Sequence, residues 1–218
     1  EVLKNRRFRK MRRLHRIPLE AIQIRGLADG HIFGGLRMKY SKNIRLKNGE
    51  DCLIRSALVD DAQGVIETFY KTHGETDYLA SNKGDKIIDL SFEESFLNEK
   101  LNSDKEVYLC AVVNGSIVGT AGVFQLGQNK IAHRAEVGIA VEKDFWSIGI
   151  GRALLMSGID CAKNAGFSQI ELEVVSDNQN AIALYRSLGF IEFGRNPRGF
   201  ITHNGKWQEL VSMRLELG

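Results

Sequence analysis

Cysteine is scarce in this sequence, and long apolar runs are absent. The 218 residues include three cysteines, Cys52, Cys110 and Cys161, which lie far apart without a CxxC pair. An odd number of distant cysteines argues against a disulfide framework or a zinc site and indicates buried thiols in a reducing compartment. No run approaches the roughly 20 apolar residues that a membrane-spanning helix needs. The five histidines show no HExxH-like spacing, so we expect no metal centre.

Patterns of export, repetition and low complexity are also missing. The basic N-terminal stretch is not followed by an apolar core and a small-residue cleavage site, as a signal peptide would be. A composition of 43% hydrophobic and 26% charged residues excludes wholesale disorder. We therefore expect a globular, cytoplasmic protein without a membrane partner.

The net charge of +3 combines two different parts. Residues 1–37 carry ten basic and three acidic residues (+7), and the remainder carries 20 basic and 24 acidic residues (−4). We expect residues 1–37 to be a basic, disordered extension outside the folded domain. Phe8, Met11, Leu14 and Ile17 recur at helical spacing, so an alternative is a helix that binds RNA or an anionic membrane. A third interpretation is that the segment is non-native and that Met38 is the natural start.

The patterning after this segment predicts a sheet crossed by helices. A lead-in over 38–50 precedes a domain at 51–218. Strands are expected at 52–58, 106–113, 116–124, 131–141, 170–174, 190–193 and 207–217, and Asn114-Gly115 is typical of a hairpin turn. Helices are expected after Asp60-Asp61, around 92–97, and over 149–165 and 178–188. The fold class is α/β of the α+β kind: a mixed, mainly antiparallel sheet of six to seven strands with helices on both faces.

The most informative stretch covers 141–155, where a strand ends and a helix begins within a turn that contains Gly149 and Gly151. Backbone N–H groups in such a turn converge on one point, and the helix dipole makes that point a phosphate site. Arg152 would add one charged contact. A Walker A loop is excluded because Arg152 follows Gly151, and the dinucleotide fingerprint lacks its third glycine, where Leu154 stands. On this motif alone, a tight turn that binds nothing stays open.

Together with that turn, residues 178–190 resemble the GCN5-related N-acetyltransferase (GNAT) superfamily, which binds acetyl-CoA. The family's Gln/Arg-x-x-Gly-x-Gly/Ala loop is similar to Trp146-Ser-Ile-Gly149-Ile-Gly151. Its Asn-x-x-Ala-x-x-Leu-Tyr-x-x-x-Gly-Phe helix is similar to 178–190 at each named position. Trp146 replaces the usual Gln or Arg, and Lys143 stands where relatives often carry Pro. Since the loop works through backbone N–H groups, only the side-chain contact of Trp146 is left open.

The resemblance implies an N-acetyltransferase that moves an acetyl group from acetyl-CoA to a primary amine by direct attack in a ternary complex. Acetyl-CoA is then the co-substrate, and a longer acyl group is left open. The residues that the resemblance assigns to its binding are Ile139, Ala140, Val141, Ile148, Gly149, Ile150, Gly151, Arg152, Ala153, Asn178 and Tyr185.

Two residues are candidates for catalysis. Tyr185 matches the family position that protonates the leaving thiolate, although a tyrosine on this helix face could equally be a core residue. Glu136 shares a strand face with Gly138 and Ala140, whose small side chains leave room for substrate, and is the candidate general base. Its alternative role is a structural carboxylate paired with Arg134 or His133. Glu171 and Glu173 are expected to be a solvated or ion-paired strand face.

By the same resemblance, the acceptor site lies near 73–97 and 195–207. Glu75, Asp77 and Asp85 could attract a cationic amine, and Arg195 and Arg198 could hold a carboxylate or phosphate; plain surface charge is the alternative for all five.

The expected partner is a small-molecule or peptide amine, and a homodimer is compatible with the sequence. Two other functions stay open: a non-catalytic acyl-CoA-binding module, and an RNA- or ribosome-associated protein that acts through residues 1–37.

Overall fold

The computed structural model describes residues 39–82, 84–85, 87–127 and 129–218, which belong to one unit. The predictions for residues 1–37 and a start at Met38 fall outside the described residues. The strands are β1 (Ser41–Arg45), β2 (Asp51–Ser56), β3 (Val107–Val113), β4 (Ser116–Gln125), β5 (Arg134–Val141), β6 (Gln169–Val175), β7 (Ile191–Ile201) and β8 (Trp207–Glu216). The helices are α2 (Ala62–Glu75), α3 (Leu90–Leu101), α4 (Ile150–Asn164) and α5 (Gln179–Ser187). Short 3-10 turns occupy Val59–Asp61, Asn129–Ile131 and Lys143–Phe145.

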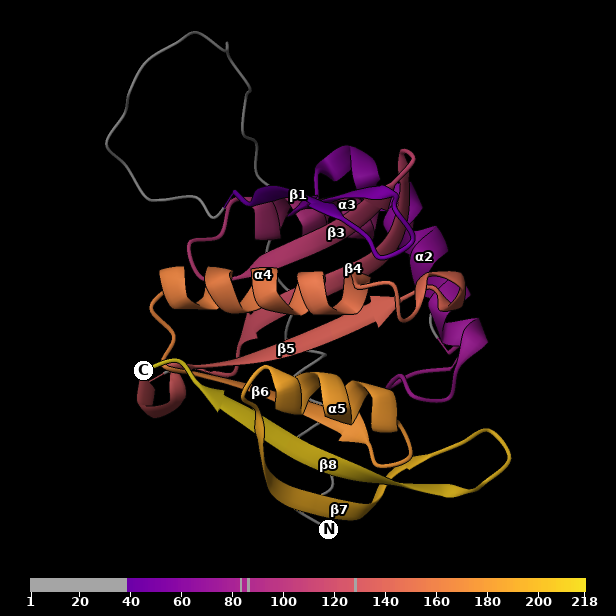
Figure 1. Cartoon of the computed structure of the whole chain (residues 1–218), viewed down its shortest axis with the longest axis vertical. Coiled ribbons are helices and arrows are strands. Elements are labelled where there is room, and N and C mark those ends of the chain that lie inside the picture. The colour runs from indigo at the N-terminus through magenta and orange to yellow at the C-terminus, as the bar shows by residue number, and fades with distance from the viewer. Residues whose placement is uncertain (1–38, 83, 86, 128) are drawn as a thin grey trace, which may run out of the picture. The chain divides into compact units, whose positions relative to one another are not determined.

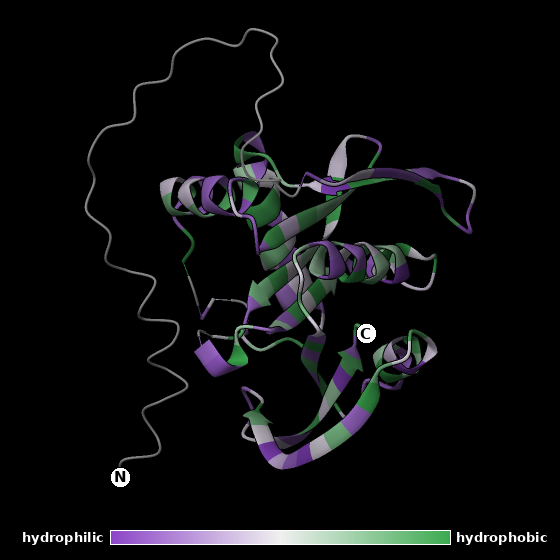
Figure 2. Ribbon diagram, turned by 90° about the vertical axis from the view of Figure 1, so that its left-hand side faces the viewer, coloured by the Kyte–Doolittle hydropathy of each residue, from purple (hydrophilic) through white to green (hydrophobic). Residues whose placement is uncertain are grey.

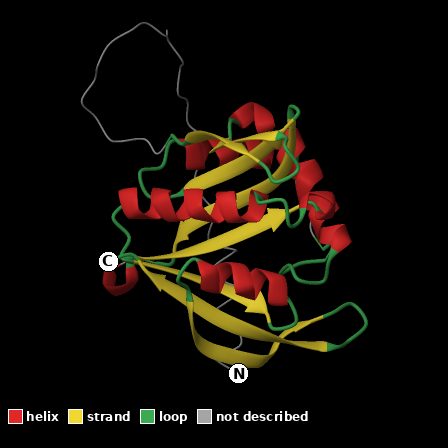
Figure 3. Ribbon diagram, viewed as in Figure 1, coloured by secondary structure: helices red, strands yellow, loops and turns green. Residues whose placement is uncertain are grey.

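The strands form one sheet in the order β1-β2-β3-β4-β5-β6-β8-β7 (Figures 1 and 3). Only β5 and β6 are parallel neighbours among the described strands, so the expected mixed, mainly antiparallel sheet is confirmed. It has eight strands rather than six to seven. The additional strand, β1, lies within the expected lead-in, and regular structure begins at Ser41 rather than near Asp51. An edge strand with one apolar residue, Ile44, carries no alternating pattern by which to predict it.

Turn chemistry explains where the predicted strands agree and where they differ. Asn114 and Gly115 have φ of 49° and 81°, as the expected hairpin turn between β3 and β4 requires. The strand β7 was expected to end at Phe193 but continues to Ile201. Its pairing with β8 shifts register between Glu192 and Gly194 and again between Asn196 and Phe200. These bulges let glycine and proline stay within an edge strand.

Helices cover both faces of the sheet, as expected. α4 and α5 pack over the main core, whereas α2 and α3 cover a smaller cluster that includes Leu97 and Cys110 on the opposite face. Figure 2, turned by 90° from Figure 1, shows that the helices carry both hydrophobic and hydrophilic segments. Gly158 of α4 packs closely on the sheet, because a Cβ there would lie 3.2 Å from Cγ2 of Val123. The helix α4 therefore lies close against the sheet.

The sheet opens between β5 and β6. Their parallel pairing is confined to residues 134–136 of β5 and 169–171 of β6. Beyond that point β5 continues to Val141 beside β4, and β6 continues to Val175 beside β8. Figure 1 shows that β5 ends next to the start of α4. We call this opening the β5–β6 gap; it positions the residues described next.

Candidate functional site

The backbone of β5 turns alternately toward β4 and toward the β5–β6 gap. The N–H of Glu142 donates to the carbonyl oxygen of Val118 at 2.9 Å. With the register of these strands, Ala140 also hydrogen-bonds to β4, because bonded pairs alternate in an antiparallel ladder. The backbone groups of Ile139 and Val141 therefore face the gap. Of the three predicted strand residues, Ala140 therefore directs its backbone groups to β4 and not into the gap.

Trp146 makes the contact that sequence analysis left open. Its Nε1–H donates to the carbonyl oxygen of Val141 at 2.7 Å. This leaves the N–H of Val141 and both backbone groups of Ile139 facing the gap. The indole N–H of a partly buried tryptophan usually has a hydrogen-bond acceptor. This general tendency is all that the sequence offers to predict the bond, and it does not identify Val141 as the acceptor.

Two residues with positive φ turn the chain from β5 into α4. They are Ser147, at 64°, and Gly149, at 114°, a value that favours glycine. Lys47, in the turn between β1 and β2, holds this turn from outside. Its N–H donates to the carbonyl oxygen of Ile148 at 3.1 Å, and its Nζ donates to that of Ser147 at 3.2 Å. Sequence analysis missed Lys47 because it did not predict β1.

The start of α4 presents backbone N–H groups and little else. The N–H of Ala153 donates to the carbonyl oxygen of Gly149 at 3.0 Å. The N–H groups of Ile150, Gly151 and Arg152 precede this bond and, with the helix dipole, favour an anion. A Cβ at Gly151 would meet nothing closer than Cδ2 of Leu184, at 3.7 Å. It would also lie 4.0 Å from side-chain atoms of Ile139 and Val141, so these are ordinary contacts and glycine is not required there by the protein's own packing.

Two predicted side chains make hydrogen bonds within the protein. Arg152 donates from Nη1 to Oγ of Ser187 at 2.8 Å and so ties α4 to the end of α5. Oδ1 of Asn178 accepts from the N–H of Ala181 at 3.2 Å and caps α5. Asp61 occupies the N-cap position of α2 without a side-chain capping bond, because its carboxylate accepts from Arg55 and from the N–H of Leu58.

Tyr185 projects from α5 into the main core. It is 8% exposed, and its ring centroid lies 5.8 Å from that of Phe190. Burial raises the pKa of Tyr185 to about 12. Its hydroxyl is therefore protonated at neutral pH, and it can donate a proton or a hydrogen bond.

Glu136 lies at the closed end of the gap, where β5 and β6 still pair. It is exposed and in register with Phe124 of β4 and Glu171 of β6. Arg134 forms an ion pair with Glu171, and Glu173 accepts from Oγ of Ser212 at 3.4 Å. The prediction of an ion-paired strand face is thus confirmed for Glu171.

A cavity of about 540 Å³ is formed by four segments that are distant in sequence. It is lined by residues 75–78 after α2, by Lys143 and Trp146, by Asp177 after β6, and by Thr202, Asn204, Lys206 and Gln208 of the β7–β8 hairpin. Oε2 of Glu75 accepts from the N–H of Lys143 at 2.7 Å. Gln208 donates from Nε2 to the carbonyl oxygen of Asp77 at 3.1 Å. These two bonds join three of the four segments.

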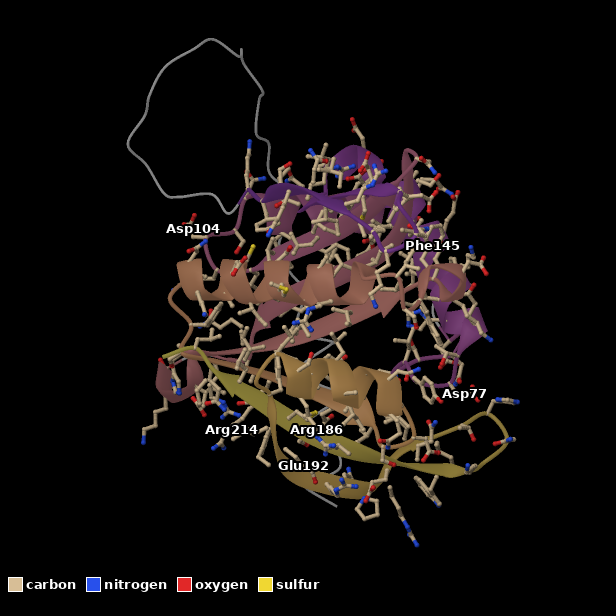
Figure 4. All side chains as sticks on the ribbon, viewed as in Figure 1. Asp77, Asp104, Phe145, Arg186, Glu192 and Arg214 are labelled. Carbon is tan, nitrogen blue, oxygen red and sulfur yellow. The ribbon has the colours of Figure 1, made fainter. Side chains whose placement is uncertain are left out.

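The cavity includes some of the predicted acceptor-site residues and excludes others. Glu75 and Asp77 line it, and Figure 4 labels Asp77 beside the β7–β8 hairpin. Asp85 accepts from the N–H of Asn82 within its own loop, at 2.8 Å. Arg195 pairs with Glu192 and Glu209, and Arg198 lies over the ring of Trp207. Sequence analysis missed Asp177 and Lys206, which no motif marks.

All three cysteines are buried, as predicted. Burial raises the pKa of Cys110 and of Cys161 to about 12, so both thiols are protonated at neutral pH. In the part of the chain that the structure describes, no cluster of His, Cys, Asp or Glu is placed to hold a metal ion. Across those same residues, no helix is both long and apolar enough to span a membrane.

Comparison with known proteins identifies a matching family model and several similar proteins. The model of the acetyltransferase (GNAT) family matches residues 67–190. The N-alpha-acetyltransferase RimI of Mycobacterium tuberculosis is 37% identical over 101 residues, which cover 46% of this chain and 62% of that protein. The L-amino acid N-acyltransferase MnaT of Escherichia coli is 34% identical over 141 residues, which cover 64% of this chain and 81% of that protein.

A solved structure agrees with the fold, and coverage of the relatives is partial. The acetyltransferase of the GNAT family from Streptococcus pneumoniae superimposes with a TM-score of 0.73 at 28% identity, covering 76% of this chain and 99% of that one. The chain spans 62% of RimI and 27% of an uncharacterized Mycobacterium leprae protein that is 38% identical, less than two thirds of either. Because the family model covers more than half of the sequence and the folds agree, the chain belongs to the acetyltransferase (GNAT) family.

Proposed function

We propose that this protein transfers an acetyl group from acetyl-CoA to a primary amine, with both substrates bound at once. The observation that carries the proposal is the β5–β6 gap, which opens beside the anion-favouring start of α4. Relatives of the chain include a ribosomal-protein-alanine N-acetyltransferase and an L-amino acid N-acyltransferase, both of Escherichia coli. An amine next to a carbonyl or carboxyl group is therefore the acceptor type we consider first.

The gap and the start of α4 suit the two ends of acetyl-CoA. The N–H groups at 150–152 would hold the pyrophosphate, with a helix dipole rather than a lysine as the source of positive potential. The N–H of Val141 and the backbone groups of Ile139 would pair with the amide groups of the pantetheine arm. When bound, acetyl-CoA supplies a thioester carbonyl for an amine to attack.

Tyr185 is our proposed acid. The bond that forms joins the amine nitrogen to the acetyl carbon, and the bond that breaks leaves a thiolate that benefits from a proton. A phenol whose pKa is raised to about 12 keeps its proton at neutral pH and can donate to that thiolate. A backbone N–H at the edge of β5 would donate to the carbonyl oxygen as negative charge develops on it.

The acceptor amine must lose a proton before it attacks, because a free alkyl ammonium has a pKa of about 10. We propose Glu136 as the base, acting through water, because its side chain shares a face of β5 with Ala140 while Glu136 itself lies at the closed end of the gap. The neighbouring Arg134 is engaged with Glu171. The acceptor itself would enter through the cavity that Trp146 and Asp177 line.

The test is release of free thiol from acetyl-CoA in the presence of primary amines, with Tyr185→Phe as the variant. We expect amine-dependent thiol release by the parent and a kcat lowered about 10- to 100-fold in Tyr185→Phe, because the lost proton donor acts in the transition state. Affinity for acetyl-CoA should be nearly unchanged. Tyr40→Phe serves as the matched control, since Tyr40 lies before β1, away from the gap.

Absence of thiol release by the parent with every amine, despite binding of acetyl-CoA, would contradict catalysis and leave a binding module. An unchanged kcat in Tyr185→Phe would remove Tyr185 from the mechanism.

A further inference from the structure

The cavity beside the gap carries charge of both signs, and most of it is unpaired. Glu75 is engaged by the N–H of Lys143. Among the described residues, the carboxylates of Asp77 and Asp177 and the ammonium groups of Lys143 and Lys206 have neither a hydrogen-bond nor an ion-pair partner. Such an arrangement favours a ligand that brings its own positive and negative groups.

The positions of these charged side chains indicate how a ligand would be oriented in the cavity. Asp177 follows β6 by two residues and so lies on the open side of the β5–β6 gap. Lys206 lies in the turn between β7 and β8, farther along the cavity. The hydrogen bond between Gln208 and the carbonyl of Asp77 fixes this hairpin against the loop after α2. Trp146 and Tyr78 supply ring surface along the same cavity.

We propose that the acceptor is a small zwitterion, a free α-amino acid or a short peptide with both termini free, and this rests on the proposed acetyl transfer. Asp177 attracts its ammonium group at the gap, and Lys206 binds its carboxylate at the hairpin. A polyamine or aminoglycoside would place positive charge against Lys143 and Lys206, and a phosphorylated acceptor would face Asp77 and Asp177. A volume of about 540 Å³ lies within the range of small-molecule sites.

The experiment compares matched acceptors in the thiol-release assay of the full chain. L-alanine is paired with L-alaninamide, and L-phenylalanine with L-phenylalaninamide. The α-amine of an amino-acid amide has a lower pKa than that of the free acid, so more of it is neutral at a given pH. The kcat/KM of each acceptor is therefore calculated from the concentration of its neutral amine. We expect the free acids to be better acceptors by about tenfold or more, since a charged hydrogen bond is lost with the amides.

Two variants separate the two ends of the ligand. Lys206→Met should raise KM for the free acids and leave the amides unaffected, so that the preference disappears. Asp177→Asn should raise KM for acids and amides alike, because both carry the ammonium group. Lys163→Met, at the exposed far end of α4, is the control and should change neither. Thermal unfolding of each variant confirms that it is folded.

Several results would contradict the proposal of a zwitterionic acceptor and leave the proposed acetyl transfer unaffected. These are equal use of acid and amide by the parent, a preference for spermidine, or a preference for a long peptide with an amidated C-terminus, which would indicate a protein N-terminus. A preference that survives in Lys206→Met would overturn the role of Lys206. Thiol release that no amine increases would instead overturn the proposed function, and the inference with it.

Discussion

Trp146 lies where the donor and acceptor sites of the proposed reaction meet. Its Nε1–H donates to the carbonyl of Val141 at the β5–β6 gap, and its ring lines the cavity. The bond fixes the last carbonyl of β5 and the chain that leads into the turn at Ser147. One side chain thus shapes both the edge that would hold the pantetheine arm and one wall of the acceptor cavity.

Trp146→Phe keeps a ring and removes the hydrogen bond. We expect the free energy of unfolding to fall by about 1 kcal/mol, the usual worth of one hydrogen bond. The KM for acetyl-CoA should rise severalfold because the turn before α4 becomes less fixed. Steady-state kinetics and urea unfolding measure both effects.

The chain offers Trp207→Phe as a matched control. Trp207 is 50% exposed, lies under Arg198 and does not line the cavity. Its replacement should leave the KM for acetyl-CoA unchanged. Equal effects of the two substitutions on that KM would argue against a role for the Trp146 hydrogen bond.

Single residues were predictable where one conformation or one motif determines them. Gly149 follows from its turn, and Asn178 and Tyr185 follow from the helix that resembles the family motif. Lys47 and Asp177 were not predictable, because their roles depend on segments that meet only in the folded chain. The sequence also could not assign the indole N–H of Trp146 to Val141.

At the scale of elements, α3 is joined to the sheet through a buried lysine. Lys100 is 5% exposed, and its Nζ lies 2.5 Å from Oε2 of Glu106 and 2.8 Å from Oε1 of Glu99. It also lies over the rings of Phe96 and Phe124. Glu106 accepts in addition from the N–H of Gln125 in β4, so one carboxylate connects the helix and the sheet.

Glu106→Gln should destabilise the protein by about 2–4 kcal/mol, because it leaves a buried ammonium group without its main counter-charge. Glu99→Gln is the control. Glu99 is 58% exposed, so its loss should cost less than about 1 kcal/mol. Urea unfolding at neutral pH gives both values. Equal losses for the two variants would contradict this account of Lys100.

The elements that the sequence predicted least well are the two strands at the edges of the sheet. β1 has a single apolar residue, and β7 contains bulges that absorb residues typical of turns. The central strands and α4 were predictable because they are buried on a periodic face. The β5–β6 gap was not predicted, since nothing in either strand's own pattern says where their pairing ends; the family resemblance supplied only Ile139, Ala140 and Val141 as residues of the donor site.

At the scale of the whole molecule, the domain and its proposed donor carry net charge of the same sign. Residues 38–218 carry a net charge of −4, yet the proposed donor is a polyanion. Backbone N–H groups and the dipole of α4 would hold it, so the overall charge does not predict the ligand. The cavity is formed by four segments that are distant in the sequence. Its charged side chains come together only in the folded chain, so the sequence does not predict the site.

The central claim is that the start of α4 binds acetyl-CoA, and Gly151→Glu tests it. A Cβ there would make ordinary contacts, with Cδ2 of Leu184 nearest at 3.7 Å, and thermal unfolding checks that the glutamate variant is folded. The new carboxylate would lie beside the expected phosphates and repel them. Asn164→Glu, exposed at the other end of α4, changes the net charge equally and is the control.

Calorimetric titration of acetyl-CoA into the three proteins is the most direct measurement. We predict one site on the parent, the same affinity in Asn164→Glu, and an affinity lower by more than about tenfold in Gly151→Glu. No binding by the parent, or equal affinity in Gly151→Glu, would contradict the claim.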